Sequence, residues 1–558
     1  MKDARNPSER ASATKADSAS KVSVCETPGI NKRIWVGGAA AILAAGGLLR
    51  LYDLNLVPLH HDEGVNANFL MRLAHEGFYQ YDPKNYHGPT LYYFAALIPW
   101  LSKFLFGRSF EEVYGLNTIT IRLVPAAFGV ATIWLVLTLR RRIGTIAALA
   151  GAALLALSPG AVYLSRYFIH EMLLVFFTLA LIATALRFYE SRRPTYLMLA
   201  ATSAALMFAT KETAIISAGV LLIAFALTMV LTQLRESYGG KSNARKRREK
   251  LATLKERLRS TTARFGGPSS LAILSIAALS LFLTIDILFY SSFFTNSPKG
   301  LYDALKTFDF WTKTGTRIHV NPWWTYLAWM LIEELPVMLL GLVGVVLAIW
   351  RGSNRFAVFT ALWALGTFAA YSLIPYKTPW LMLNFVVPLA IMGGYAFEEI
   401  YNQARARKHL FVALAIAVVA LGVSGYLSLK LNFIHYDDDR YVYVYVHTRR
   451  DIFPMLEEID RIAKRAGTGG QTVITVTSPE YWPLPWYLRH YSVRYGEVTV
   501  SEDPIIIGTG NQGALLMTLN GGRYEQVKSG LNPAGTFTLR PGVGLALFVR
   551  RDLGGQVP

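Results

Sequence analysis

Long apolar runs constrain the fold of this chain more than any other feature. About eleven runs of roughly 17 to 22 residues are each long enough to cross a hydrocarbon core of about 30 Å. They begin near Ile34, Ile119, Ile143, Glu171, Tyr196, Ala214, Ser269, Leu335, Phe356, Leu381 and Leu410. Because 53% of the 558 residues are apolar, the sequence predicts an α-helical, polytopic membrane protein.

The positive charge of the chain lies mostly between the apolar runs. The net charge is +19, and the stretch from Lys241 to Arg264 alone holds ten Lys or Arg against two acids. This distribution is typical of cytoplasmic loops rather than of a nucleic-acid surface, so we expect no nucleic-acid partner. The positive-inside rule then predicts a protein of the plasma (inner) membrane with a cytoplasmic N-terminus and an outer C-terminal part.

One further run, Pro89 to Gly107, is ambiguous. If this run crossed the membrane, Arg140–Arg142 and the basic stretch would face outward, against the positive-inside rule. It carries Lys103 and opens with Pro89, Tyr92 and Tyr93, which suits a helix lying in the interface. We therefore interpret it as interfacial, in contact with membrane lipids.

The chain divides into three predicted parts. Residues 1–33 are polar and are predicted to form a disordered cytoplasmic tail. Residues 34–430 form the membrane domain, and residues 431–558 a small extracytoplasmic α/β domain. In that domain we expect strands at 441–446, 472–477, 505–507 and 545–549 and a helix at 451–466. The single cysteine, Cys25, excludes internal disulfides and a cysteine-based metal site.

Acidic residues recur where apolar runs meet the predicted outer face. Asp62 and Glu63 follow the first run, Glu171 opens a later run, and Glu212 stands beside Lys211 at a third turn. Each position also has a structural interpretation: a helix cap for the first pair, a water-facing loop residue for Glu171, and an interfacial ion pair for Lys211 and Glu212. Their common side nevertheless predicts a shared catalytic site, with Asp62, Glu63 and Glu171 as the catalytic candidates.

Cationic side chains on the predicted outer face are few. Arg166, Lys211 and Lys377 are candidates to neutralise a donor phosphate. His61, His170 and Glu212 are further candidates for the site. His60, His61 and Asp62 could also bind a metal, but no second histidine cluster with ligand spacing accompanies them, so no metal ligand is assigned.

These features occur in an order that resembles a known family. An acidic pair lies in a long first outer loop, Gly88-Pro89 leads to Leu91-Tyr92-Tyr93, and Arg122-Leu123 opens the next run; the Arg166…Glu171 and Lys211-Glu212 turns follow. The chain resembles the GT-C superfamily of glycosyltransferases that use polyprenyl-phosphate sugars. Within it, the chain is similar to family 39, the branch of the dolichyl-phosphate-mannose-protein mannosyltransferases and aminoarabinose transferases, and to its flippase-activity-associated subgroup.

The resemblance implies a GT-C fold and a chemistry. A polyprenyl-phosphate-linked sugar is the implied donor, the acceptor is a protein, lipid or glycan, and transfer proceeds with inversion. Asp62 corresponds to the general base, with Glu63 beside it; Glu171 occupies a position where relatives more often carry Asp, and Lys211 corresponds to a basic residue of the third turn. No cofactor is implied with certainty, and because metal use varies across the superfamily a divalent cation stays an open alternative.

Two other functions stay open from the sequence. A transporter or flippase-associated component would carry charges within its spans and show paired, broken helices, whereas the charges here lie at span ends, with Asp286 as the nearest exception. A non-catalytic scaffold would use the outer domain, for instance the aromatic stretch 481–487, to bind a partner.

Overall fold

A computed structural model of the chain describes residues 30–85, 87–106, 115–238, 262–263, 265–314, 319–529 and 535–553. The predicted tail lies outside the described residues up to position 29. Most of the basic stretch from Lys241 to Arg264 lies outside them as well.

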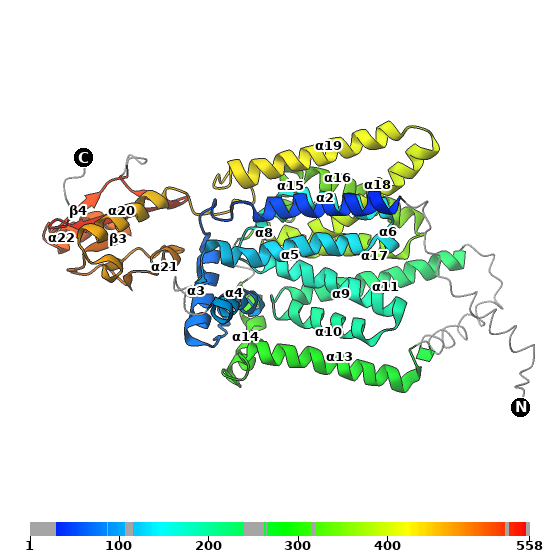
Figure 1. The fold of residues 1–558 in the computed structure, drawn as a ribbon, viewed down its shortest axis with the longest axis horizontal. Coiled ribbons are helices and arrows are strands. Elements are labelled where there is room, and N and C mark those ends of the chain that lie inside the picture. The colour runs from blue at the N-terminus through cyan, green and yellow to red at the C-terminus, as the bar shows by residue number, and fades with distance from the viewer. Residues whose placement is uncertain are drawn as a thin grey trace, which may run out of the picture.

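A bundle of long helices forms most of the described chain (Figure 1). It comprises α2 (Lys32–Leu51), α5 (Thr118–Thr138), α6 (Arg140–Ile143), α7 (Thr145–Leu157), α8 (Pro159–Ser165), α9 (Glu171–Ser191), α10 (Pro194–Phe208), α11 (Ala214–Tyr238), α13 (Gly267–Tyr290), α15 (Thr325–Glu333), α16 (Leu335–Arg351), α17 (Arg355–Leu373), α18 (Leu383–Ala406) and α19 (Leu410–Leu429). Every predicted apolar run is helical, which confirms the α-helical, multi-pass membrane fold.

The number of spans depends on how bent helices are counted. Within the described ranges, eight helices are long and apolar enough to cross a membrane, or up to ten if two bent pairs each form one span. The pairs are α7 with α8, bent by 62°, and α15 with α16, bent by 115°. The remaining predicted run is α10, which is apolar but has only 15 residues. The prediction of about eleven spans therefore exceeds the structure's count because it included this short helix.

Helix α18 is the centre of the bundle. In the most apolar stretch of the segment Pro379–Ala406, which contains α18, 89% of the residues are buried. Small residues allow the neighbouring helices to approach α18 closely. A Cβ atom at Gly394 would lie 2.1 Å from the Ala147 carbonyl oxygen of α7, and one at Gly344 of α16 would lie 1.9 Å from the Met392 carbonyl oxygen. Larger side chains at either glycine would force these helices apart.

Three helices lie at the end of the bundle that faces the C-terminal domain (Figure 1). These are α3 (His61–Glu76), α4 (Thr90–Phe106) and the amphipathic α14 (Lys299–Thr314). The ambiguous run from Pro89 to Gly107 forms α4, whose apolar part, Thr90–Leu101, is shorter than a span. This arrangement agrees with the prediction that the run is interfacial.

The C-terminal region contains one mixed sheet. Its strands are β1 (Val473–Val476), β2 (Ser492–Tyr495), β3 (Ile505–Thr509), β4 (Tyr524–Val527), β5 (Phe537–Arg540) and β6 (Val543–Arg550), in the order β2-β1-β3-β6-β4 with β5 paired to β6. Helices α20 (Ile452–Arg465), α21 (Leu484–Tyr487) and α22 (Gly513–Leu519) accompany it. Strand β1 is parallel to β2 and β3, and β6 is antiparallel to its partners. The predicted α/β composition is confirmed.

The predicted strand at 441–446 is wrong. This segment forms turns in the connection between α19 and the sheet region, although its Tyr-Val alternation is typical of a strand. Its backbone finds side-chain partners instead of a neighbouring strand: the Val442 N–H donates to Glu333 Oε1 at 2.8 Å, and His60 Nε2 lies 3.0 Å from the Tyr445 carbonyl oxygen. Alternation alone cannot supply a ladder partner.

Candidate functional site

The loop between α3 and α4 is fixed to the α10–α11 turn by backbone pairing. The Gly88 N–H donates to the Thr210 carbonyl at 3.0 Å, and the Thr90 N–H donates to the Ala209 carbonyl at 3.2 Å. A glycine is required at position 88, because a Cβ there would lie 2.0 Å from the Ala209 carbonyl oxygen. This pairing brings His87 opposite Lys211.

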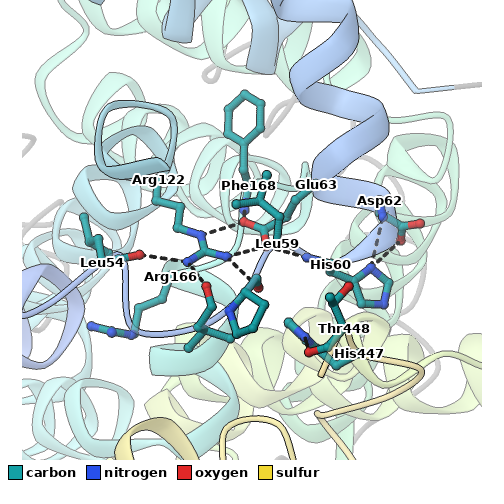
Figure 2. A network of polar contacts seen from close by, with 12 residues as sticks. Leu54, Leu59, His60, Asp62, Glu63, Arg122, Arg166, Phe168, His447 and Thr448 are labelled. Atoms are coloured by element: carbon teal, nitrogen blue, oxygen red, sulfur yellow. Dashed lines mark hydrogen bonds and ion pairs between the residues drawn. The ribbon is translucent and has the colours of Figure 1, made fainter. Parts of the chain in front are cut away.

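Asp62 and Glu63 lie in the first turn of α3, and their side chains point in different directions. The Asp62 N–H donates to His60 Nδ1 at 3.0 Å and the His60 N–H donates to Glu63 Oε2 at 3.0 Å, which caps the helix. Consecutive helical residues do not face the same way. Glu63 points toward Arg122, whereas Asp62 lies on the other side of His60 (Figure 2).

Glu63 is part of a buried network rather than of an open site. Its carboxylate is fully buried and accepts from Arg122 Nε at 2.8 Å and Nη2 at 2.6 Å, and from the Phe168 N–H at 2.8 Å. Arg122 also donates to the carbonyl oxygens of Leu54 and Val57, both at 2.8 Å. The network joins the loop before α3, the start of α5 and the α8–α9 turn. These partners occupy the acceptor sites of the carboxylate, so we expect Glu63 to stabilise the fold rather than to take part in the chemistry.

Two of the predicted phosphate-binding cations are also occupied. Arg166 donates to the carbonyl oxygens of Leu49, Tyr52 and Asp53 at the end of α2. Lys377 is buried and donates to the carbonyl oxygens of Ser372 at 3.0 Å and Ile374 at 2.6 Å. The Arg166 guanidinium and the Lys377 ammonium both donate to carbonyl groups at helix ends, so the structure does not bring them to a common site.

A cavity of about 230 Å³ lies where the start of α3, the α3–α4 loop, the α8–α9 turn and the α10–α11 turn meet. Since about 10–15 Å³ on the same measure is enough for one water, it can admit a small polar ligand. Its lining is His61, Asp62, Val65, Asn66, Lys84, Asn85, His87, Ile169, Glu171, Lys211, Glu212, Thr213, His319, Tyr371, Ile374, Tyr376, Trp380 and Leu381. Five predicted site residues are thus together: His61, Asp62, Glu171, Lys211 and Glu212.

Asp62 presents a free carboxylate to the cavity. Its side chain is 41% exposed, and its nearest ionisable partner in the described part of the chain is His60 Nδ1 at 3.9 Å. Burial lowers the pKa of the adjacent His61 to about 4, with Asp62 opposing and His60 and Arg540 reinforcing the fall. His61 is therefore neutral at physiological pH.

Lys211 is enclosed by acids. Its ammonium donates to the Glu171 carboxylate, and Glu212 lies 3.2 Å from His87 Nδ1. Burial alone would lower the pKa of Lys211, but Glu171 and Glu212 outweigh it and raise the pKa above its usual value. Lys211 is thus a permanent cation that is already neutralised.

His170 lies beside the cavity without lining it. Its Nε2 lies 3.0 Å from the Gly88 carbonyl oxygen, and its ring stands 4.9 Å from that of His87. Burial holds the pKa of His170 well below its usual value. We interpret it as a neutral residue that positions the loop between α3 and α4.

Several lining residues were not predicted as functional. Lys84 is exposed on the loop between α3 and α4, and its ammonium makes no ion pair with any described residue. A single lysine in a polar loop gives no sequence signal. The same holds for the other unpredicted lining residues, which only the fold brings together: His87, Thr213, His319, Tyr371 and Trp380.

The C-terminal region contacts the cavity wall. The Tyr445 hydroxyl lies 2.7 Å from His319 Nδ1, and Arg540 Nη1 lies 3.4 Å from His61 Nδ1. The Tyr487 hydroxyl accepts from the Leu59 N–H at 2.8 Å. The connection after α19 and strand β5 therefore support two cavity residues.

We find no candidate metal-binding cluster among the residues that the structure describes. No three His, Cys, Asp or Glu side chains there are grouped so as to hold a metal ion.

Comparisons with known proteins agree with this fold. Residues 95–239 match the family model of dolichyl-phosphate-mannose-protein mannosyltransferases. The fold resembles that of ArnT from Cupriavidus metallidurans, whose structure was determined with undecaprenyl phosphate bound: the TM-score is 0.61 at 14% identity, over 94% of this chain and 100% of that one. The apo oligosaccharyltransferase of Archaeoglobus fulgidus gives a TM-score of 0.53 at 14% identity, over 91% and 74%. The resemblance to GT-C glycosyltransferases of the family 39 type is confirmed.

Curated relatives match over a shorter stretch. The undecaprenyl phosphate-alpha-4-amino-4-deoxy-L-arabinose arabinosyl transferase of Pseudomonas aeruginosa is 31% identical over 116 residues, and that of Pseudomonas paraeruginosa is 32% identical over the same length. The match spans 20% of this chain and about a fifth of each relative, 21% of its length.

Proposed function

We propose that this protein is a glycosyltransferase that takes a sugar from a polyprenyl phosphate and transfers it, with inversion, to an acceptor at the outer face of the plasma membrane. One observation carries the proposal: Asp62, Glu171 and Lys211 come from three separate turns and line one cavity. A family match over residues 95–239 and an ArnT-like fold support it. The acceptor is a protein, lipid or glycan.

Asp62 is the general base of the proposed reaction. Its carboxylate takes the proton of an acceptor hydroxyl, whose oxygen forms a bond to the anomeric carbon. The bond from that carbon to the phosphate oxygen breaks, and polyprenyl phosphate leaves with the bonding electron pair. Attack from the side opposite the phosphate inverts the anomeric carbon. A positioned base of this kind contributes about 10²- to 10⁴-fold.

Lys84 is the cation best suited to the donor phosphate. Lys211 is already paired with Glu171, whereas Arg166 and Lys377 donate to backbone carbonyls. Lys84 lines the cavity with an ammonium that has no acidic partner in the described residues. A cation there stabilises the charge that develops on the leaving phosphate.

Charge and the position of the cavity support the outer location. Residues of α3 and of the loop that follows it line the cavity. Helix α3 lies at the bundle end nearest the C-terminal domain, whereas α6 with its arginines lies at the other end (Figure 1). If these arginines are cytoplasmic, the cavity and the C-terminal domain are outside.

Replacing Lys84 with Ala is expected to weaken binding of undecaprenyl phosphate by about 10-fold, because one charge-assisted contact of about 1.5 kcal/mol is lost. The measurement is ligand titration of the purified full-length protein by native mass spectrometry. Lys464→Ala, an exposed lysine of α20, is the matched control and should leave binding unchanged. Equal affinities for wild type and the Lys84 variant would exclude Lys84 as the phosphate ligand.

A further inference from the structure

Two buried hydroxyl groups face the cavity without a partner. Tyr371 is 1% exposed and Thr213 is 4% exposed, and both side chains line the cavity. The two hydroxyls lie close enough to interact with each other, and neither has any other hydrogen-bond partner within the described part of the chain. Buried polar groups normally have partners, so these two point to a ligand that supplies them.

The surroundings of these hydroxyls offer both donors and acceptors. Tyr371 lies in the last turn of α17 and Thr213 directly before α11, close to the Lys211 ammonium and the Glu171 carboxylate. A sugar hydroxyl both donates and accepts a hydrogen bond, and therefore matches such a mixed set. A phosphate only accepts, and would meet the two carboxylates.

Aromatic side chains complete this part of the cavity. Tyr376 and Trp380 belong to the segment that follows α17 and line the same cavity. Small-molecule sites commonly combine apolar, aromatic walls with a few placed polar groups. A sugar ring matches such a site, because its C–H faces are apolar and its edge carries polar hydroxyl groups.

We propose that the part of the cavity lined by Thr213, Tyr371 and Lys211 binds the sugar of the donor, and that it selects sugars without a carboxylate. This inference rests on the proposed function. The selection follows from charge: Glu171 and Glu212 outnumber the single cation Lys211 around these hydroxyls. A uronic acid would bring a third carboxylate into this group, and like charges in a desolvated site repel.

The test compares lipid ligands with and without a sugar. Undecaprenyl phosphate and its mannose, glucose, galactose and glucuronic acid esters are titrated against the full-length protein by native mass spectrometry. We expect one neutral sugar ester to bind more tightly than undecaprenyl phosphate, and the glucuronic acid ester to bind more weakly than that neutral ester. Thr213→Val and Tyr371→Phe should each weaken the neutral ester by roughly 3- to 10-fold, the loss of one hydrogen bond. Binding of undecaprenyl phosphate itself should change less than about 2-fold.

Thr228→Val is the matched control, since the Thr228 hydroxyl donates to the Ala224 carbonyl of the same helix, α11, and does not line the cavity. The melting temperature of each variant reports folding; loss of an unpartnered hydroxyl should not lower it. The inference is overturned if both variants weaken all ligands equally, if neither changes sugar binding, or if glucuronic acid is accepted as well as the neutral sugars. Failure of the wild type to bind undecaprenyl phosphate would overturn the proposed function as well.

Discussion

Replacing Glu63 with Gln is expected to destabilise the protein strongly, by about 3–5 kcal/mol. The change keeps the size of the side chain but leaves the buried Arg122 guanidinium without its carboxylate. The three segments held by this pair would separate, and Asp62 would lose its position as a consequence. The measurement is thermal unfolding in detergent, followed by intrinsic fluorescence.

Glu76→Gln is the matched control for Glu63. Glu76 belongs to the same helix and pairs with Arg72 at 3.4 Å, but both side chains are exposed. Such pairs contribute about 0–1 kcal/mol, so the control should melt close to wild type. An apolar replacement of both Glu63 and Arg122 should recover part of the stability, because no charge is then left buried alone. If Glu63→Gln kept full stability and lost only turnover, Glu63 would have a chemical role after all.

Replacing Asp62 with Asn is expected to lower the rate of sugar transfer by about 10²- to 10⁴-fold, the contribution of a positioned base. The amide is nearly isosteric but cannot accept the proton at neutral pH. Binding of undecaprenyl phosphate and the melting temperature should stay close to wild type, because the Asp62 carboxylate is partly exposed and has no strong ion pair.

The rate is measured as release of undecaprenyl phosphate from the neutral sugar ester that binds best, with cell-envelope material as the source of acceptors. The same assay on Glu76→Gln controls for changes in α3 that do not touch the cavity. Full turnover by Asp62→Asn would remove Asp62 from the mechanism.

The membrane helices were predictable because span length and apolarity are local properties. All the predicted runs are helices, and the interfacial interpretation of the run that forms α4 agrees with its place at the bundle end. The sequence wrongly predicted a strand at 441–446, because strand formation needs a partner strand that an alternating sequence does not specify. There, Glu333 and His60 take the backbone groups.

Part of the cavity lining was predictable from the sequence. Asp62, Glu171 and Lys211 stand at the ends of apolar runs. The positive-inside rule therefore predicted that they share one side of the membrane. Whether a charged side chain there is free or already has hydrogen-bond partners depends on the direction of the side chain and on nearby carbonyl groups. The contacts of Glu63 and Arg166 with Arg122 and with backbone carbonyls could not be read from the sequence, nor could the place of Lys84 in the cavity lining.

We propose that the cavity between α3 and the α8–α9 and α10–α11 turns receives the phosphate and sugar of a polyprenyl-phosphate donor. A cryo-EM structure of the full-length protein with undecaprenyl phosphate tests this proposal. We expect the phosphate next to Lys84, in the cavity that Asp62, Glu171 and Lys211 line, with the isoprenoid chain leading away along the membrane helices. A phosphate bound at the opposite end of the bundle, by the arginines of α6, would contradict the account.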